Sequence, residues 1–335
     1  MKVVITGGGG FIGSQLAAKL LKKGQLSNSE GKVHPIEQLL LFDRIFPDAV
    51  AKWANQQGSV TDLTLLTGDI SSREEVENAL SGDLVSVFHL AAMVSGECEV
   101  HFDDAMAVNL DGTHHVVESL RNHPGCPRLV FASSVGTYGG EDLPETVADS
   151  TKQIPQTTYG MTKVIGELLV NDYSRKGFLD GRSVRLPTVI IRPGQPNAAA
   201  SSWASGMFRE PLAGETCHLP VHRDQLHPVI GYRDVIDAFI ALHETPAERL
   251  GADRAFTLPS HRITVGEGLT LLEQVADERG IPLGMVLDHI DPVVQAIVDT
   301  WPTATDGSRA LALGLPRLRS VEQIIRDYID DFLDP

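Results

Sequence analysis

The chain has 335 residues, of which 42% are hydrophobic and 21% are charged. At about 150 residues per domain, this length predicts two domains, or one large domain with a lobe, and the composition supplies ample material for a core. Lysine and arginine total 28 against 44 aspartate and glutamate residues, which gives a formal net charge of -16. Because such an acidic chain repels phosphate backbones and anionic lipid, we expect neither nucleic acid nor a membrane as a partner.

Cysteine usage and hydropathy bear on where the protein works. Cys98, Cys126 and Cys217 are an odd number without Cys-x-x-Cys spacing, which argues against a disulfide framework and favours a reducing cytoplasm. No apolar run reaches the roughly 18–20 residues of a membrane span. The segment Met1–Thr6 leads directly into glycines, unlike a signal peptide. We therefore expect a soluble, cytoplasmic protein.

Short apolar runs alternate with helical patterns in the first half of the chain. The predicted strands are Lys2–Thr6, Leu39–Asp43, Leu65–Gly68, Val85–Leu90, Arg128–Ser133 and Ser183–Ile191. The predicted helices are Gly13–Lys23, Arg73–Leu80, Met106–Asn122 and Tyr159–Lys176. Short strands separated by helices form βαβ units. The pattern therefore predicts an α/β fold with a doubly wound parallel sheet, covered on both faces.

The sequence pattern changes at the turn-rich segment Arg192–Asn197, after which strands and helices no longer alternate regularly. Later helices are predicted at Val235–Leu242, Val265–Arg279 and Val321–Leu333. We expect the first of these to return to the N-terminal domain and the other two to belong to a lobe. The expected division is a first domain of residues 1–185, to which 228–256 return, and a smaller C-terminal lobe of residues 186–227 and 257–335.

A glycine-rich loop follows the first predicted strand and opens directly into a helix, as Gly7-Gly8-Gly9-Gly10-Phe11-Ile12-Gly13. So tight a turn needs residues that tolerate positive φ, and a pyrophosphate approaches the backbone closely only where no Cβ intervenes. Amide groups and the dipole of the helix N-terminus then favour the anion. Strand, loop and helix in this order predict a dinucleotide site with Gly7, Gly10 and Gly13 at the spaced positions.

Asp43 ends the second predicted strand. A carboxylate there accepts hydrogen bonds from an adenosine ribose and repels a 2′-phosphate, which favours NAD over NADP. The gap from Gly13 exceeds the usual roughly 20 residues, which we assign to an insertion over Gln25–Glu37, and Arg44 weakens the preference. The alternative is that Asp43 only caps the strand end.

Three further positions lie near the expected cofactor. Asp69 follows the third strand, where its carboxylate either holds the adenine amino group or caps the next helix. Leu90-Ala91-Ala92 ends the fourth strand with small residues, as expected where a flat cofactor meets backbone. Asn109 lies within a predicted helix and either ties the active-site strand to its neighbour or is exposed.

Tyr159 and Lys163 are four residues apart and thus share one helix face, and Ser134 lies just after the fifth strand. A phenol is a weak base, with a pKa of about 10. A nearby ammonium and a positively charged nicotinamide favour the phenolate, which can remove an alcohol proton while the carbon hydride leaves for the cofactor. Ser134 would orient the same oxygen, and Lys163 can also bond the nicotinamide ribose. These residues predict a dehydrogenase.

Together, these motifs resemble the extended short-chain dehydrogenase/reductase superfamily, which contains nucleotide-sugar epimerases and dehydratases. The resemblance covers nearly the whole chain and implies a Rossmann fold, NAD(P) and a catalytic set of Ser134, Tyr159 and Lys163. The implied cofactor contacts are Gly7, Gly10, Phe11, Ile12, Gly13, Asp43, Asp69, Ile70, Leu90, Ala91, Ala92, Asn109, Ser133, Tyr159, Lys163 and Pro187.

The chain departs from the epimerase pattern where a nucleotide diphosphate would bind. Thr188 stands where those enzymes usually have an asparagine, and His227 stands where they usually have a phosphate-binding arginine. Both differences favour a smaller substrate. The runs HLAAMVSG, RLPTVIIRPGQPN and SSWASGMFREPLAG resemble instead the D-erythronate dehydrogenases of the superfamily, which implies oxidation of the C2 hydroxyl of D-erythronate to 2-dehydro-D-erythronate with NAD.

A small sugar acid needs one cation and several hydrogen-bond groups. Arg192, Arg209 and Arg233 are candidates for the cation, and we favour Arg192, with a surface salt bridge as its alternative role. The predicted substrate contacts are Ser95, Ser134, Tyr159, Thr188 and Arg192.

Two other functions remain open: a nucleotide-sugar epimerase or dehydratase with tightly bound NAD, and a redox-sensing binding protein without catalysis. A homodimer is implied by the superfamily. We expect no metal site, although Cys217, His218, His222 and His227 lie close in sequence, because prolines interrupt any helix that would align the histidines.

Overall fold

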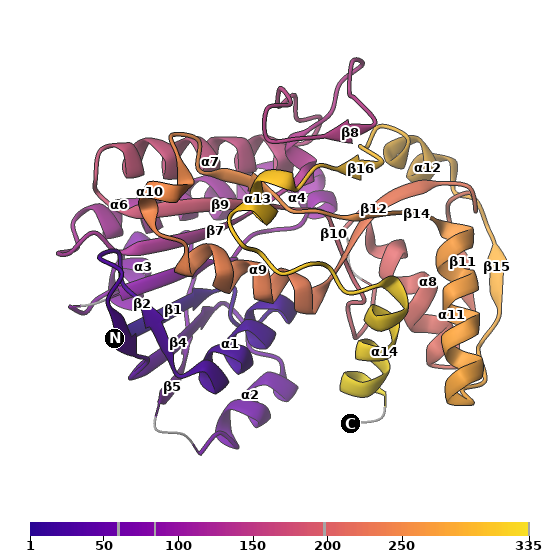
Figure 1. The fold of residues 1–335 in the computed structure, drawn as a ribbon, viewed down its shortest axis with the longest axis horizontal. Coiled ribbons are helices and arrows are strands. Elements are labelled where there is room, and N and C mark those ends of the chain that lie inside the picture. The colour runs from indigo at the N-terminus through magenta and orange to yellow at the C-terminus, as the bar shows by residue number, and fades with distance from the viewer. Residues whose placement is uncertain (59–60, 84, 197–198, 334–335) are drawn as a thin grey trace.

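A parallel sheet of seven strands runs through the larger part of the molecule in the order β13-β9-β7-β6-β1-β4-β5 (Figure 1). Its strands are β1 (Lys2–Thr6), β4 (Gln38–Asp43), β5 (Asp62–Thr67), β6 (Val85–His89), β7 (Arg128–Ser134), β9 (Asp180–Leu186) and β13 (Ala255–Thr257). The computed structural model describes residues 1–58, 61–83, 85–196 and 199–333. The strand order reverses between β1 and β6, the place where open α/β sheets bind ligands at their carboxyl ends. The doubly wound parallel sheet expected from the sequence is confirmed.

Helices cover both faces of this sheet. On one face lie α1 (Phe11–Lys23) and α9 (Tyr232–Glu244), and on the other lie α3 (Arg73–Ala79), α6 (Gly112–Arg121) and α7 (Thr158–Arg175). Strand β1 shows why its sequence is continuously apolar, because Val3 and Ile5 belong to the core under α1 while Val4 belongs to the core under α3 and α6. A strand buried on both faces has no polar side to alternate with.

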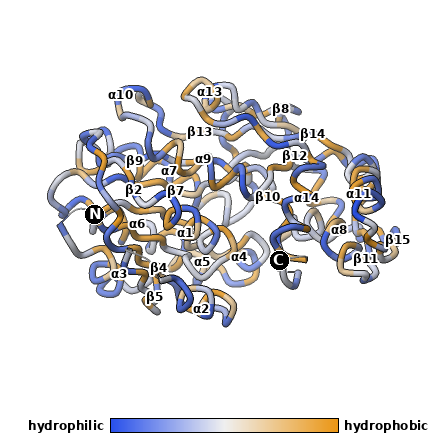
Figure 2. The backbone as a smooth tube through the Cα atoms, turned by 60° about the horizontal axis from the view of Figure 1, so that its bottom comes forward, coloured by the Kyte–Doolittle hydropathy of each residue, from blue (hydrophilic) through white to orange (hydrophobic). Residues whose placement is uncertain are grey.

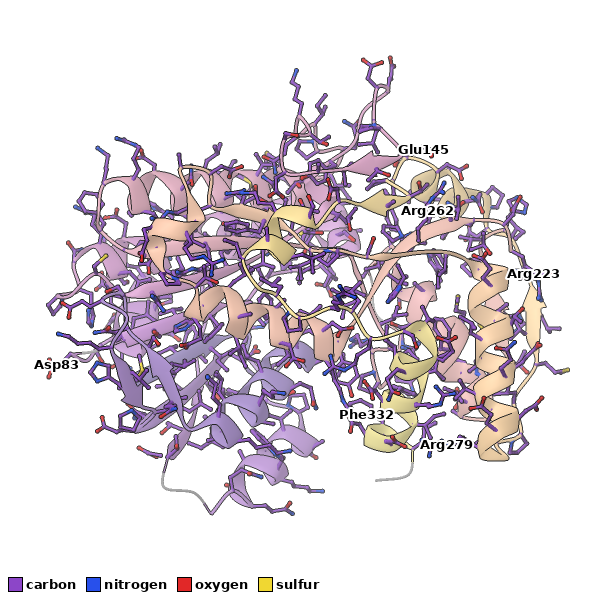
Figure 3. The ribbon with its side chains drawn as sticks, in the orientation of Figure 1. Asp83, Glu145, Arg223, Arg262, Arg279 and Phe332 are labelled. Carbon is purple, nitrogen blue, oxygen red and sulfur yellow. The ribbon has the colours of Figure 1, made fainter. Side chains whose placement is uncertain are left out.

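The smaller lobe has its own sheet and core, seen on the right of Figure 1. Its sheet orders β10 (Thr188–Ile190), β12 (Leu226–Gly231) and β14 (His261–Thr264), and around it lie α8 (Ser202–Leu212), α11 (Val265–Arg279) and α14 (Val321–Phe332). Hydrophobic and hydrophilic residues alternate along α11, as expected for a helix with one buried face (Figure 2). Arg262 of β14 lies beside Glu145, with 3.4 Å between Nη2 and Oε2, and Phe332 lies at the end of α14 (Figure 3).

Short elements complete the chain. They are β2 (Gln25–Ser27), β3 (Val33–Pro35), α2 (Asp48–Asn55), α4 (Ser95–Val100), α5 (Phe102–Ala105), β8 (Thr146–Val147), β11 (Cys217–Leu219), α10 (Ala247–Leu250), β15 (Val286–Asp288), α12 (Pro292–Val298), β16 (Ala304–Thr305) and α13 (Ser308–Ala312). The expected insertion before Asp43 contains the antiparallel hairpin of β2 and β3. Among the described residues, no helix is long and apolar enough to cross a bilayer.

The single strand predicted over Ser183–Ile191 is wrong in one respect, because the chain divides it at Pro187. Strand β9 ends at Leu186 in the large sheet, whereas β10 begins at Thr188 and pairs with β12 in the small one. Proline has no N–H to donate to a ladder, so it marks the change of sheet. The predicted helix Met106–Asn122 likewise begins with a π-helical turn, Met106–Asp111, before α6.

Residues 228–256 divide between the two parts of the molecule. Helix α9 packs on β7 and β9, and β13 joins the large sheet, as expected for a return to the first domain. Strand β12, in contrast, pairs with β10 and β14 of the small sheet. The domain boundaries at residues 185, 227 and 256 stay a prediction.

Candidate active site

The glycine loop has the geometry that close backbone approach requires. Gly7 has a φ of 74°, and a Cβ on Gly13 would lie 2.2 Å from the Gly7 carbonyl oxygen. A Cβ on Gly7 would lie 2.7 Å from the amide nitrogen of Ala91, in the segment after β6. No side chain of the described residues caps the start of α1 at Gly10, so the first turn of the helix presents amide groups suited to an anion.

Asp43 lies beside this loop at the end of β4. Its Oδ2 accepts a hydrogen bond from the Gly9 amide at 2.9 Å, and its Oδ1 accepts one from the Arg44 amide at 2.7 Å. The carboxylate therefore helps to hold the loop as well as ending the strand. Its predicted contact with the adenosine ribose stays a prediction.

Asp69 and Ile70 follow β5. The Asp69 carboxylate accepts hydrogen bonds from the Ser71 amide at 2.9 Å and the Ser71 hydroxyl at 2.7 Å, and these bonds lower the pKa of Asp69. The residue that precedes α3 is Ser72, so Asp69 lies one turn further out than a helix cap. Ile70 is buried against Gly112 of α6, in the core rather than at the surface. The predicted adenine contacts stay predictions.

Asn109 is buried and ties the segment after β6 to the helix that carries Tyr159. Its Oδ1 accepts a hydrogen bond from the Met93 amide at 2.8 Å, and its Nδ2 donates to the Met93 carbonyl at 3.2 Å. The same Nδ2 lies 3.5 Å from the Thr162 hydroxyl of α7. The side chain is therefore buried and not exposed, and it joins a loop to a helix where a link between strands was expected. Its predicted contact with the cofactor stays a prediction.

The catalytic candidates meet where β7 ends against the start of α7. Helix α7 begins after Thr157, whose hydroxyl accepts a hydrogen bond from the Gly160 amide at 3.0 Å. A Cβ on Gly160 would lie 2.2 Å from the Gly136 carbonyl oxygen, so only glycine lets α7 approach the turn that follows Ser134. This close approach places Ser134 and Tyr159 next to each other.

Burial sets the protonation of these groups. It raises the pKa of the Tyr159 phenol to about 12, while a hydrogen bond with the Ser134 hydroxyl acts in the opposite direction. Burial lowers the pKa of Lys163 to about 8, and its Nζ donates to the Ala132 carbonyl at 2.8 Å. The same Nζ lies 5.5 Å from the centroid of the Tyr159 ring. The structure thus brings together the three side chains that the sequence paired, and their catalytic roles stay a prediction.

Two of the remaining cofactor candidates are buried near this point. The Ser133 hydroxyl is buried and donates to Glu167 of α7. Pro187 is buried at the junction of β9 and β10. Phe11 and Ile12 form the first turn of α1, and Leu90, Ala91 and Ala92 follow β6. The contacts of these residues with a cofactor stay predictions.

Thr188 and His227 come together in the small sheet. The Thr188 hydroxyl and the His227 Nε2 are 2.7 Å apart, and the imidazole contacts both Trp203 and Trp301, with ring centroids 5.1 and 5.5 Å away. Burial lowers the pKa of His227 to about 3, so the ring is neutral. Thr188 and His227 therefore form a hydrogen-bonded pair without charge, and the predicted contact of Thr188 with a substrate stays a prediction.

The three candidate cations differ in their partners. Arg209 pairs with Glu210 at 2.9 Å, and Arg233 pairs with Asp327 and Asp331. Arg192 donates to the Gln195 carbonyl at 2.8 Å and forms no salt bridge with a carboxylate in the described part of the chain. Its alternative role in a surface salt bridge is not seen among those residues.

Ser95 and the four residues considered for a metal site lie in different parts of the structure. The Ser95 hydroxyl, at the start of α4, accepts a hydrogen bond from the Ala200 amide at 3.4 Å. Cys217 and His218 lie on β11, away from His227 on β12. Within the ranges that the structure describes, no three His, Cys, Asp or Glu side chains are grouped as a metal site would require. The expectation of no metal stays a prediction.

Sequence reasoning missed two residues under the catalytic helix. Glu167 and Arg185 form a buried ion pair, with 2.7 Å between Oε2 and Nη2. Glu167 lies four residues beyond Lys163, which continues the spacing that links Tyr159 to Lys163. That periodicity, together with an arginine inside an otherwise buried strand, was the available signal.

These features fit a bound dinucleotide, because a loop that only glycine can form opens the first helix at the point where the strand order reverses. The sequence profile of the NAD dependent epimerase/dehydratase family matches residues 3–254. The chain belongs to this family of extended short-chain dehydrogenases/reductases, as its motifs suggested. The expectations of an NAD-dependent oxidoreductase of this type, and of a Rossmann fold, are confirmed.

Particular relatives narrow the comparison. The chain is 42% identical to D-erythronate dehydrogenase of Cupriavidus necator over 335 residues, covering 99% of this chain and 98% of that protein. It is 38% identical to D-erythronate dehydrogenase of Haemophilus influenzae over 334 residues, covering 98% and 99%. A crystal structure described as a nucleoside-diphosphate-sugar epimerase from Agrobacterium tumefaciens matches with a TM-score of 0.88 at 34% identity, covering 100% of this chain and 95% of that one. The two D-erythronate dehydrogenases support a sugar-acid dehydrogenase.

Proposed function

We propose that the protein oxidises the C2 hydroxyl of a small sugar acid, D-erythronate, to 2-dehydro-D-erythronate with NAD. The observation that carries this proposal is the meeting of Ser134, Tyr159 and Lys163 beside the segment after β6 and the glycine loop. The two similar D-erythronate dehydrogenases support the choice of substrate.

The chemistry divides between the cofactor and the protein. NAD, when bound, supplies the acceptor for the hydride that leaves the C2 carbon. Tyr159 takes the proton of the C2 hydroxyl, and Ser134 holds the same oxygen. Burial holds the pKa of Tyr159 at about 12, so forming the phenolate needs both the nearby Lys163 ammonium and the positive charge of the bound nicotinamide. Alcohol thus becomes ketone, with the proton on the protein.

The substrate carboxylate has one suitable partner among the three candidate arginines. Arg209 and Arg233 already pair with carboxylates, whereas Arg192 is bonded to a backbone carbonyl. A guanidinium in that condition can exchange a neutral partner for a charged one, which forms the stronger bond. We assign Arg192 to the carboxylate, with Ser95 and Thr188 as hydrogen-bond groups for hydroxyls.

We place the uncharged pair of Thr188 and His227 beside the substrate, at the end opposite the carboxylate. There it favours a substrate that carries no phosphate. The neutral imidazole offers no cation to a phosphate, and burying an unpaired anion beside it is costly. This consideration supports a small sugar acid over a nucleotide sugar.

We also propose a homodimer that buries α4, α5 and α7. Val100 is 74% exposed, Phe102 is 54% exposed and Leu168 is 62% exposed, and α7 contacts both of the other helices. Large apolar side chains gathered on adjacent helices favour a partner surface. Light scattering of the wild type and of Leu168→Lys tests this proposal, since the variant should be monomeric.

We also propose a cytoplasmic location, which was expected from the cysteines and agrees with their being free in this structure.

The deciding experiment measures NADH formation with four- to six-carbon aldonic and uronic acids. We expect NADH to accumulate with D-erythronate. The competing function, a nucleotide-sugar epimerase, is favoured by the description of the similar crystal structure. It would convert a nucleotide sugar with no net change in NADH absorbance, and that result would overturn the proposal. NAD binding without turnover of any substrate would favour the redox-sensing binding protein.

A further inference from the structure

Three consecutive residues at the end of β7 each contact the catalytic helix α7. The Ala132 carbonyl accepts from Lys163 at 2.8 Å, the Ser133 hydroxyl donates to Glu167, and the Ser134 hydroxyl lies close enough to the Tyr159 phenol to lower its pKa. The helix residues are spaced four apart and so lie on one face of α7. The first and third contacts belong to the proposed catalytic set, whereas the middle contact has no part in the chemistry.

Glu167 is 5% exposed and its carboxylate is saturated with donors. Besides Ser133, it accepts from Gln153 Nε2 at 2.8 Å and from Arg185 Nη2 at 2.7 Å. Arg185 Nε also donates to both carboxylate oxygens, at 3.0 and 3.1 Å. A buried carboxylate with so many fixed donors is held in one position.

Arg185 extends this arrangement around the turn that follows Ser134. It lies directly opposite Ser133 in the ladder between β7 and β9. Its Nη1 donates to the Tyr138 hydroxyl at 2.8 Å, and Tyr138 follows the turn Val135–Thr137. The turn that follows Ser134 is therefore held at both ends, by Ser133 before the turn and by Tyr138 after it.

We propose that Glu167 is a positioning residue, which acts through Ser133 to hold the Ser134 hydroxyl opposite the Tyr159 phenol. Arg185 balances its charge and fixes the far side of the same turn. The inference rests on the proposed function, because Ser134 and Tyr159 have their roles only in that reaction. A small displacement of a group that orients a reacting atom has a large effect on rate.

The alternative is a buried ion pair that only stabilises the fold. A matched pair of variants separates the two roles. Ser133→Ala removes the hydroxyl that donates to Glu167. Ser86 lies on the neighbouring strand β6, and Ser86→Ala removes a similarly buried hydroxyl that is hydrogen-bonded to His243 at 3.0 Å. Both variants lose one buried hydrogen bond, but only the first borders the catalytic turn.

We expect Ser133→Ala to lower kcat about tenfold or more while the dissociation constant of NAD stays unchanged. Ser86→Ala should lower the melting temperature similarly and leave kcat unchanged. Equal kcat values for the two variants would overturn the proposal. Weakened NAD binding in Ser133→Ala would also overturn it, since that result would make the hydroxyl a cofactor contact.

Glu167→Gln provides a second measurement. It keeps a side-chain oxygen for Ser133 but removes the charge that pairs with Arg185, and its effect on kcat should not add to that of Ser133→Ala. Additive effects would show that the two residues act independently. If Glu167→Gln does not fold, the two serine variants still decide.

Crystal structures of the two serine variants keep this test separate from the proposed reaction. We expect the Ser134 hydroxyl to be displaced from the Tyr159 phenol in Ser133→Ala and to keep its wild-type position in Ser86→Ala, whatever the substrate. A Ser134 hydroxyl that keeps its wild-type position in Ser133→Ala would overturn the inference alone. Failure of the wild type to oxidise any acid would overturn only the proposed function.

Discussion

Thr188 and His227 are hydrogen-bonded between adjacent strands of the small sheet, with 2.7 Å between Oγ1 and Nε2, although 39 residues separate them in the chain. Thr188 follows β9 by two residues, and Leu186 at the end of β9 lies opposite Ser134 in the ladder. The pair therefore lies within the lobe, two residues beyond the strand that runs beside Ser134. Because the imidazole is neutral and buried, the pair offers no charge to a phosphate.

Thr188→Val tests this pair with little change in side-chain volume. Loss of the hydroxyl removes the proposed substrate contact and the partner of His227, so we expect KM for the acid to rise about tenfold, as for one hydrogen bond. The NAD dissociation constant should stay the same. Thr245→Val, which removes a buried hydroxyl bonded to the Ala241 carbonyl at 2.8 Å, is the control. An unchanged KM in Thr188→Val would assign Thr188 to the fold alone.

Tyr159→Phe tests the proton acceptor. Without the phenol, the C2 hydroxyl has no base, and we expect turnover to fall about 10²- to 10⁴-fold while NAD still binds. Steady-state NADH formation and a binding titration measure the two effects. Tyr173→Phe, on the same helix and bonded to Glu118, controls for the loss of a hydroxyl from α7. Turnover at the wild-type rate in Tyr159→Phe would require another base.

Asp43→Asn tests cofactor choice while keeping an oxygen for the Gly9 amide. Removing the charge removes repulsion toward a 2′-phosphate, so we expect the ratio of kcat/KM for NADP to that for NAD to rise about tenfold. Asp62→Asn, at the exposed start of β5, is the control for a change of net charge. An unchanged ratio would place the preference elsewhere, for example at Arg44.

The sequence predicts those parts of the fold and site that depend on neighbouring residues. The glycine loop is readable because strand, turn and helix follow each other, and Tyr159 pairs with Lys163 through helical spacing alone. In contrast, the Thr188–His227 contact depends on the change of sheet at Pro187, which a continuous apolar run conceals. Glu167 was overlooked because an acidic residue on a helix usually faces water, and its burial depends on Arg185 from another strand.

Three buried histidines predict how stability responds to acid. Burial lowers the pKa of His89 and His227 to about 3 and that of His243 to about 4. An unfolded histidine has a pKa of about 6.5, so below that pH the unfolded chain binds more protons than the folded one. The stabilisation from a neutral buried histidine is thus complete above about pH 6.5 and is lost as the pH falls toward the folded pKa.

When the pH is lowered from about 7 to about 5, the free energy of unfolding should fall by about 2 kcal/mol for each of these histidines. Urea unfolding at the two pH values measures the loss. The two ring nitrogens of His89 are hydrogen-bonded to hydroxyls, Nδ1 to Thr6 at 2.6 Å and Nε2 to Thr113 at 3.1 Å. His89→Asn keeps polar atoms for these hydroxyls but removes the ring that titrates. We expect His89→Asn to lose less stability across this range than the wild type, whereas the exposed variant His222→Gln should match it. An equal pH dependence in all three proteins would show that His89 is not held neutral by the fold.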